Sequence, residues 1–150
     1  MLAGRFTCPE IKGSVNPSDL SYVVDRFRDI FGCEVPLRQG IGHVPSQPGD
    51  FGYQHIVARY NEGLVNHDAS REARGLWQKA LLQPGAAVGR QYECHSQNYM
   101  QGKKKRTMRV FVDYKAFRGY MYKGITTAYW VSGHKPCPTV NLQNDKETDS

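Results

Sequence analysis

The sequence predicts an α+β domain in which N-terminal helices pack on a C-terminal antiparallel β-sheet. Apolar residues recur at helical spacing in the first half of the chain, whereas β-branched and aromatic residues alternate between turn glycines after residue 86. A chain of 150 residues is long enough for one hydrophobic core and too short for two. We therefore expect a single α+β domain over residues 1–140 and a disordered polar tail over residues 141–150.

The first predicted helix covers residues 16–32, "NPSDLSYVVDRFRDIFG". Asn16 or Ser18 can accept hydrogen bonds from the backbone N–H groups at its start, and Gly32 supplies a left-handed residue at its end. The residues that form its apolar stripe are Leu20, Val23, Val24, Phe27, Ile30 and Phe31. A loop rich in glycine and proline follows over residues 38–50.

Two further helices are predicted before the sheet. The second covers residues 51–62, with Asp50 as its cap and Gly63 at its end, and the third covers residues 68–82, with Asp68 as its cap. On the second helix, His55 and Arg59 are four residues apart and therefore share a face. The inward side chains expected on the third helix are Ala73, Leu76, Trp77 and Ala80.

The second half of the chain predicts strands. The segments are residues 86–94, 107–114, 118–124 and 125–132. Met108, Val110 and Val112 alternate and should lie on one sheet face. Residues 95–106, "HSQNYMQGKKKR", predict a polar loop that ends in four basic residues.

Charge points to polyanionic partners. Lysine and arginine outnumber aspartate and glutamate by 20 to 14, which gives a net charge of +6 and favours nucleic acid as a partner, although such a charge also aids solubility. No apolar run is long enough to span a membrane, and "MLAGRFTCPE" lacks the apolar core of a signal peptide. We therefore expect a soluble protein, either cytoplasmic or an exported effector whose signal was removed, and no membrane partner.

The four cysteines leave two possibilities open. They are widely spaced and form no Cys-x-x-Cys pair, so the sequence predicts no structural zinc site. Two disulfides suit a secreted domain, and four buried thiols suit a reducing compartment.

Histidines are the main candidates for acid–base chemistry. His43 in the Gly/Pro loop and His55 on the second helix could provide a general acid and a general base on opposite sides of a phosphate. The alternative is that each is a surface or half-buried residue without a catalytic role.

Three other histidines are weaker candidates. His67 stands at the entrance of a predicted helix, where it can help to cap it, and His134 lies in a loop after the last strand. His95 follows Cys94, but a lone Cys-His pair does not have the spacing of a metal site.

The other common catalytic patterns are missing from the sequence. It has no GxxxxGK[ST], HExxH or GxSxG motif and no obvious carboxylate cluster for a metal, so we expect neither a metal nor a cofactor. Histidines, cations and hydroxyls remain, and these suffice to cleave RNA. A base removes the proton of the 2′-OH, an acid protonates the leaving 5′-oxygen, and a cation stabilises the phosphorane-like charge.

The order "GH…GYQHIVARY…MRVFVDYKAFRGYMYKGITTAYW" resembles the EndoU endoribonucleases, including the nidoviral branch. "TAY" also looks like the end of bacterial toxin domains that are similar to ribonuclease A. The resemblance covers roughly residues 43–131 and implies that His43 and His55 are the two catalytic histidines. It also implies that Thr127 and Tyr129 contact phosphate and base, that RNA is the substrate, and that an inhibitor or immunity protein is a partner.

The catalytic cation is assigned least specifically. Lys79 follows the two histidines along the chain, as the catalytic lysine does in the family that the sequence resembles, while Arg59 and Arg90 are alternatives. The basic residues expected to contact RNA are Arg59, Arg90, Lys103, Lys104, Lys105 and Arg106. Thr127 and Tyr129 share a strand face by their spacing and are also ordinary strand residues. The sequence therefore predicts a metal-independent endoribonuclease that forms a 2′,3′-cyclic phosphate, with a non-catalytic basic RNA-binding or protein-interaction module as the alternative.

Overall fold

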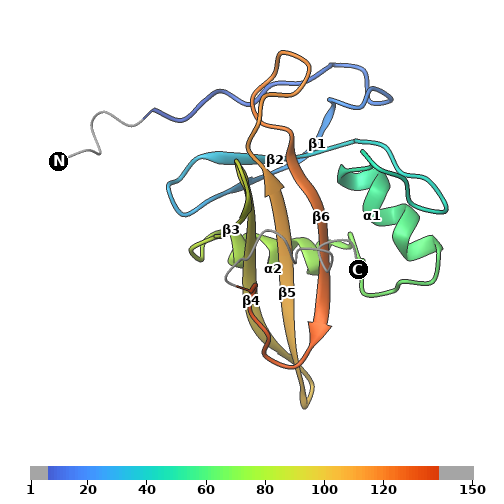
Figure 1. Cartoon of the computed structure of the whole chain (residues 1–150), viewed down its shortest axis with the longest axis vertical. Helices are drawn as coiled ribbons and strands as arrows, with labels where there is room; N and C mark the ends of the chain where they lie inside the picture. The colour runs from blue at the N-terminus through green and yellow to red at the C-terminus, as the bar shows by residue number, and fades with distance from the viewer. Residues whose placement is uncertain (1–6, 139–150) are drawn as a thin grey trace.

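A computed structural model describes residues 7–138 and contains two antiparallel sheets and two helices (Figure 1). The elements, in chain order, are β1 (Val23–Arg28), β2 (Glu34–Arg38), α1 (Gly52–Asn61), α2 (Arg71–Leu81), β3 (Ala86–Gly89), β4 (Tyr92–Gln101), β5 (Lys104–Asp113) and β6 (Gly124–Ser132). The predicted α+β class is confirmed. The prediction that helices come first is wrong, because a two-stranded sheet precedes them. The tail predicted over residues 141–150 lies outside the described residues.

The segment predicted as the first helix forms β1 and the turn after it. β1 pairs with β2, placing Phe27 opposite Val35, and both side chains are buried. Ile30 and Phe31, which were assigned to a helical stripe, lie exposed in the turn. The Asp29 carboxylate fixes this turn by accepting from the backbone N–H groups of Phe31 (2.9 Å) and Cys33 (3.0 Å). Pairing with the apolar strand β2 therefore overrides the helical spacing.

The four-stranded sheet has the order β3-β4-β5-β6. β4 and β5 pair without interruption from Tyr92↔Asp113 to Gln101↔Lys104, so most of the predicted polar loop over residues 95–106 is strand. Polar side chains do not prevent this pairing, because the backbone supplies the hydrogen bonds of the ladder. Gly102, with φ of 60°, lies in the short turn between the two strands.

Both predicted later helices are present, but their caps differ. The Ser70 hydroxyl accepts from the backbone N–H of Ala73 (3.2 Å) and caps α2, while Asp68 accepts from the backbone N–H of Ser70 (2.9 Å). α1 begins after Phe51 without a side-chain cap, because Asp50 is engaged elsewhere. Among the described residues, neither helix is long and apolar enough to cross a membrane.

The main core lies between α2 and one face of the large sheet. Trp77 of α2 is fully buried there among Met108, Val110 and Val112, whose predicted alternation is confirmed. Figure 1 shows α2 crossing behind the sheet and α1 beside β6. The sheet therefore has a second face that α2 does not cover.

A smaller core covers that second face. Its buried members are Val88, Cys94, Phe111 and Tyr129. A disulfide joins Cys94 to Cys137, and a second joins Cys8 to Cys33, which decides between the two possibilities left open for the cysteines.

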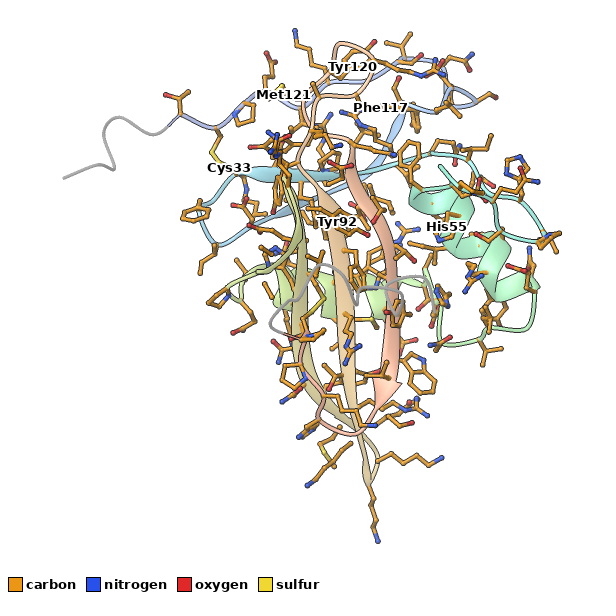
Figure 2. All side chains as sticks on the ribbon, in the orientation of Figure 1. Cys33, His55, Tyr92, Phe117, Tyr120 and Met121 are labelled. Atoms are coloured by element: carbon orange, nitrogen blue, oxygen red, sulfur yellow. A yellow bond between two sulfur atoms is a disulfide. The ribbon has the colours of Figure 1, made fainter. Side chains whose placement is uncertain are left out.

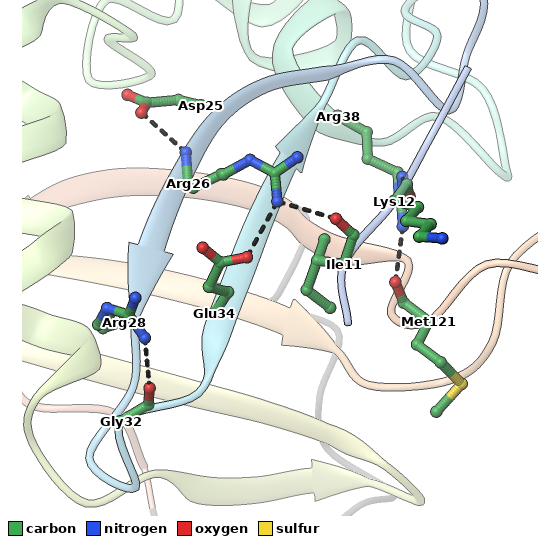
Figure 3. Close-up of polar contacts among 9 residues, drawn as sticks. All are labelled: Ile11, Lys12, Asp25, Arg26, Arg28, Gly32, Glu34, Arg38 and Met121. Atoms are coloured by element: carbon green, nitrogen blue, oxygen red, sulfur yellow. Dashed lines mark hydrogen bonds and ion pairs between the residues drawn. The ribbon is translucent and has the colours of Figure 1, made fainter. Parts of the chain in front are cut away.

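Arg38, at the end of β2, joins three parts of the chain. Its side chain is fully buried (0% exposed), and its guanidinium group donates to four backbone carbonyls. The acceptors are Lys12 (2.7 Å), Ser21 (2.7 Å), Met121 (2.8 Å) and Tyr122 (2.9 Å). Figure 3 shows Arg38 with Lys12 and Met121, beside the Arg26–Glu34 ion pair that crosses β1 and β2. Burial lowers the pKa of Arg38 to about 10, so the group remains charged at neutral pH.

Candidate active site

A cavity of about 380 Å³ lies where α1, β6 and the loop before α1 meet. Its volume is in the range of small-ligand sites. The residues that line it are Ser46, Gln47, Pro48, Gly49, Asp50, His55, Arg59, Tyr92, Thr126 and Thr127. Figure 2 labels His55 on α1 and Tyr92 on the sheet, with β6 running between them.

α1 supplies an imidazole and a cation to this cavity. His55 is 8% exposed and lies one helical turn before Arg59, so both side chains face the cavity from the same side of the helix. Arg59 Nη1 lies 3.7 Å from Glu62 Oε1, so the two side chains form an ion pair three residues apart on the helix. Ile56 and Ala58, on other faces of α1, are buried and anchor the helix to the rest of the molecule.

Two glycines allow the loop to approach the start of α1. Gly40 has φ of 66° and Gly52 has φ of 78°, a region that disfavours other residues. A Cβ on Gly40 would overlap the carbonyl oxygen of Phe51, and a Cβ on Gly52 would lie 2.7 Å from the carbonyl oxygen of Arg38. The tight crossing of these backbones holds the cavity wall against the helix that carries His55.

A β-bulge in β6 brings two consecutive threonines to the cavity. Phe111 pairs with Thr127 and Val112 with Ile125, so Thr126 is the additional residue in β6. In a regular strand, neighbouring side chains point to opposite faces, but here both threonines line the cavity. The Thr126 hydroxyl donates to the carbonyl oxygen of Phe111 (3.2 Å) and lies 3.1 Å from the hydroxyl oxygen of Tyr92.

The Thr127 hydroxyl is buried in the cavity wall. Thr127 is 5% exposed, and its Oγ1 has no hydrogen-bond partner among residues 7–138. A buried hydroxyl without a partner loses its hydrogen bonds to water, at a free-energy cost of about 1–3 kcal/mol. A polar ligand group that bonded to Oγ1 would remove this cost.

His43 is held at the edge of the cavity by Asp50. Its Nδ1 lies 2.7 Å from Asp50 Oδ1, while Asp50 Oδ2 accepts from the backbone N–H groups of His43 and Gln47 (both 3.0 Å). Burial raises the pKa of Asp50, but the hydrogen bonds from Gln47 and His43 outweigh it, and the net pKa is lowered. Asp50 therefore organises the loop and orients the imidazole, instead of capping α1 as the sequence predicted. His43 itself does not line the cavity.

Tyr129 lies on the same sheet face as Thr127 but does not line the cavity. It is 1% exposed, and its ring stacks on Phe111 (5.6 Å between centroids) and packs against His67 (5.0 Å). Tyr129 therefore forms part of the core beneath the site.

The other predicted basic residues lie outside the cavity. Lys79 is exposed on α2, and Arg90 is exposed in the turn between β3 and β4. The lysine cluster Lys103–Lys105 is exposed at the turn between β4 and β5. Arg106 stacks over the Trp130 ring, with its Cζ 3.7 Å from the ring centroid. Of the predicted basic residues, all of which the structure describes, Arg59 alone lines the cavity.

The three weaker histidine candidates have structural surroundings. His67 and His95 are buried, and His134 is exposed. His95 Nδ1 lies 2.9 Å from the carbonyl oxygen of Gln83, and its Nε2 lies 3.2 Å from Glu93 Oε1. None of these three histidines lines the cavity with His55.

Sequence reasoning missed Tyr92, Thr126 and the loop over residues 46–49. The Tyr92 ring stacks on the Phe111 ring, with 6.2 Å between the centroids, and its hydroxyl reaches Thr126 on β6. The alternation of residues along β4 does not reveal this contact. The bulge that exposes Thr126 depends on the pairing with β5 and leaves no local pattern. The glycine- and proline-rich composition of the loop before α1 was the one available signal, because such loops often carry binding residues.

Within residues 7–138, no three side chains of histidine, cysteine, aspartate or glutamate are grouped so that they could hold a metal ion. No protein-family model matches the chain, and no curated protein or solved structure shows significant similarity to it.

Proposed function

We propose that the chain is a metal-independent endoribonuclease that cleaves single-stranded RNA and leaves a 2′,3′-cyclic phosphate. The observation that carries the proposal is the meeting of three groups in one cavity: the His55 imidazole, the Arg59 guanidinium and the buried Thr127 hydroxyl. An acid or base, a cation and a hydrogen-bonding hydroxyl are the groups needed around a phosphodiester whose own 2′-OH is the nucleophile.

In the proposed reaction, the 2′-oxygen bonds to phosphorus as the bond from phosphorus to the 5′-oxygen breaks. We assign the base to His43, because a carboxylate on Nδ1 stabilises the imidazolium that forms when Nε2 takes the 2′-OH proton. His55 donates a proton to the leaving 5′-oxygen. Arg59 stabilises the charge on the phosphoryl oxygens, and Thr127 Oγ1 bonds to one of them.

His43 must reach a substrate from the edge of the cavity. Asp50 links the two sides of the site, because its carboxylate binds His43 while the residue itself lines the cavity. A nucleotide that fills the cavity would therefore extend toward the His43 ring. Tyr129 supports Thr127 from below in this arrangement, in place of the base contact that the resemblance to EndoU proteins implies.

The charge and the disulfides favour an exported effector over a cytoplasmic protein. A net charge of +6 favours RNA as a substrate, and two disulfides are typical of oxidising compartments. An acidic inhibitor protein that covers the cavity would be the corresponding partner in the cell that makes the protein.

The test is cleavage of a single-stranded RNA in excess EDTA, with His55→Ala as the paired variant. We expect cleavage to persist in EDTA, to produce a cyclic phosphate end, and to fall by about 10²–10⁴-fold in His55→Ala. DNA of the same sequence should remain intact, because it has no 2′-OH. Cleavage that EDTA abolishes would contradict the proposal, and binding without cleavage would favour the non-catalytic RNA-binding module.

A further inference from the structure

The segment between β5 and β6, residues 114–123, alternates aromatic and basic residues: "YKAFRGYMYK". We call it the 114–123 arm. Its tip is a tight turn in which Phe117 and Tyr120 exchange two backbone hydrogen bonds (2.7 and 2.8 Å). Arg118 and Gly119 occupy the turn with φ of 54° and 83°, the left-handed pair typical of two-residue hairpins.

Contacts with the body of the protein fix the arm in place. The carbonyl oxygens of Met121 and Tyr122 accept from buried Arg38 (2.8 and 2.9 Å). Within the arm itself, the Lys123 backbone N–H donates to the carbonyl oxygen of Lys115 (2.8 Å), and the Tyr114 and Tyr122 rings meet edge to face at 4.9 Å. The arm therefore presents its side chains in a preorganised arrangement, which reduces the entropy lost on binding.

Two cations gather around the Phe117 ring. Lys123 Nζ lies 6.0 Å from the Phe117 ring centroid and 4.6 Å from that of Phe51, and Arg118 Cζ lies 5.7 Å from the Phe117 centroid. Neither cation forms an ion pair with a carboxylate in the part of the chain that the structure describes. Hydrogen bonds from Ser21 lower the pKa of Asp19, and Arg118 adds a smaller effect through space. The two positive charges are therefore available to an anion.

The cations lie close to the candidate active site. The Phe117 ring packs edge-on against Phe51, with 5.0 Å between centroids. Phe51 stands between Asp50, which lines the cavity, and α1, which carries His55. Figure 2 shows Phe117 between Tyr120 and the end of α1 that begins at Gly52. A strand that leaves the cavity past this end of α1 would meet Lys123 and Arg118.

We infer that the 114–123 arm binds the phosphates of single-stranded nucleic acid beside the cavity, with Lys123 and Arg118 as the phosphate contacts. The inference rests on the proposed function for the identity of the strand. Half-buried Phe117 and Tyr120 add ring surface on which unpaired bases can stack, which favours a single strand over a duplex or an acidic protein.

The test is binding of a labelled single-stranded DNA oligonucleotide, measured by fluorescence anisotropy at several salt concentrations. DNA lacks the 2′-OH, so binding is measured without cleavage. We expect Arg118→Ala with Lys123→Ala to weaken binding about tenfold or more at low salt. The slope of log K against log salt should become shallower by about 1.4, because two phosphate contacts are lost at about 0.7 each.

Arg71→Ala is the matched control, because Arg71 is exposed at the start of α2 and its loss changes the net charge by the same unit as each arm substitution. Phe117→Leu, which keeps both cations, should weaken binding several-fold with an unchanged salt slope. The inference is overturned if the double variant loses no more affinity for the oligonucleotide than twice the loss caused by Arg71→Ala. It is also overturned if the arm substitutions weaken binding of an acidic polypeptide such as polyglutamate but not binding of the oligonucleotide. Arm-dependent binding by a chain that cleaves no RNA would uphold this inference and contradict the proposed function instead.

Discussion

Asp50 holds the His43 imidazole with a 2.7 Å contact between Oδ1 and Nδ1, and the same carboxylate bonds to the backbone of the loop that walls the cavity. The side chain of Asp50 is 2% exposed. One buried carboxylate therefore orients a candidate catalytic group and shapes the wall beside it.

This arrangement predicts a loss of stability in acid. The folded-state pKa of Asp50 is lowered, so its ionised form stabilises the fold above the pKa of the unfolded chain. This contribution should disappear as the pH falls through the lowered folded-state pKa. In urea unfolding from pH 7 to pH 2, the free energy of unfolding should fall more steeply with decreasing pH in the unsubstituted chain than in Asp50→Asn. If the two chains lose stability in parallel, ionised Asp50 does not stabilise the fold.

Arg38 should be among the most sensitive positions for stability. Replacing it with methionine keeps much of the volume but leaves four backbone carbonyls without their donor. We expect Arg38→Met to lower the free energy of unfolding by about 3 kcal/mol or more. Chemical denaturation gives this value, with Arg28→Met as a control at an exposed arginine; an equal effect of the two substitutions would show that the Arg38 contacts contribute little.

The two disulfides should contribute comparably to stability, with the Cys94–Cys137 bridge contributing slightly more. It joins residues separated by 43 positions, against 25 for Cys8–Cys33. Loop-closure entropy gives about 4 kcal/mol for the longer loop and about 3.5 kcal/mol for the shorter. Unfolding of the paired Cys→Ser variants measures both. Removal of Cys94–Cys137 should also lower RNA cleavage more than removal of Cys8–Cys33, because Cys94 packs with Tyr129 beneath Thr127.

Gly40 should tolerate no side chain, whereas Gly63 provides a matched comparison. Both have positive φ (66° and 100°), but a Cβ on Gly63 meets nothing within 4 Å, whereas one on Gly40 would overlap the Phe51 carbonyl. Gly63→Ala should cost about 1 kcal/mol from backbone conformation alone. Gly40→Ala should cost clearly more, as measured by thermal or urea unfolding. Equal losses would mean that the loop can move away from α1 freely.

Local patterns predicted the parts of the fold that local physics controls. Both later helices and the strands β5 and β6 follow from side-chain periodicity, and the residues expected to face inward on α2 lie against the core. The strand predicted over residues 118–124 is wrong, because these residues form a turn with isolated bridges between β5 and β6. The strand predicted over residues 86–94 is divided by a turn into β3 and the start of β4. The helix predicted over residues 16–32 is wrong because pairing with the next strand, β2, decides the conformation of this segment. The turn between β4 and β5 is shorter than predicted for the same reason, since backbone pairing extends through polar residues.

The candidate site was predicted only in part. His55 and Arg59 are four residues apart on one helix, so sequence spacing alone places them together. Thr127 joins them through the contact between α1 and β6, and its neighbour Thr126 reaches the cavity through a bulge that no local signal reveals. Tyr129, a residue type common in strands, is buried in the core, whereas Thr127 on the same strand face lines the cavity. Two residues on one strand face can therefore differ in access to a cavity.

The central claim is that the buried hydroxyl of Thr127 contacts RNA in the same cavity as His55. Substitution by valine replaces only the hydroxyl with a methyl group, while serine keeps the hydroxyl. The decisive measurement is single-turnover cleavage of an RNA in EDTA by Thr127→Val and Thr127→Ser, with unfolding curves to confirm that both remain folded. We predict a loss of about tenfold or more in the valine variant and near-complete retention in the serine variant. Valine and serine variants that cleave at equal rates, or an unsubstituted chain that leaves RNA intact, would contradict it.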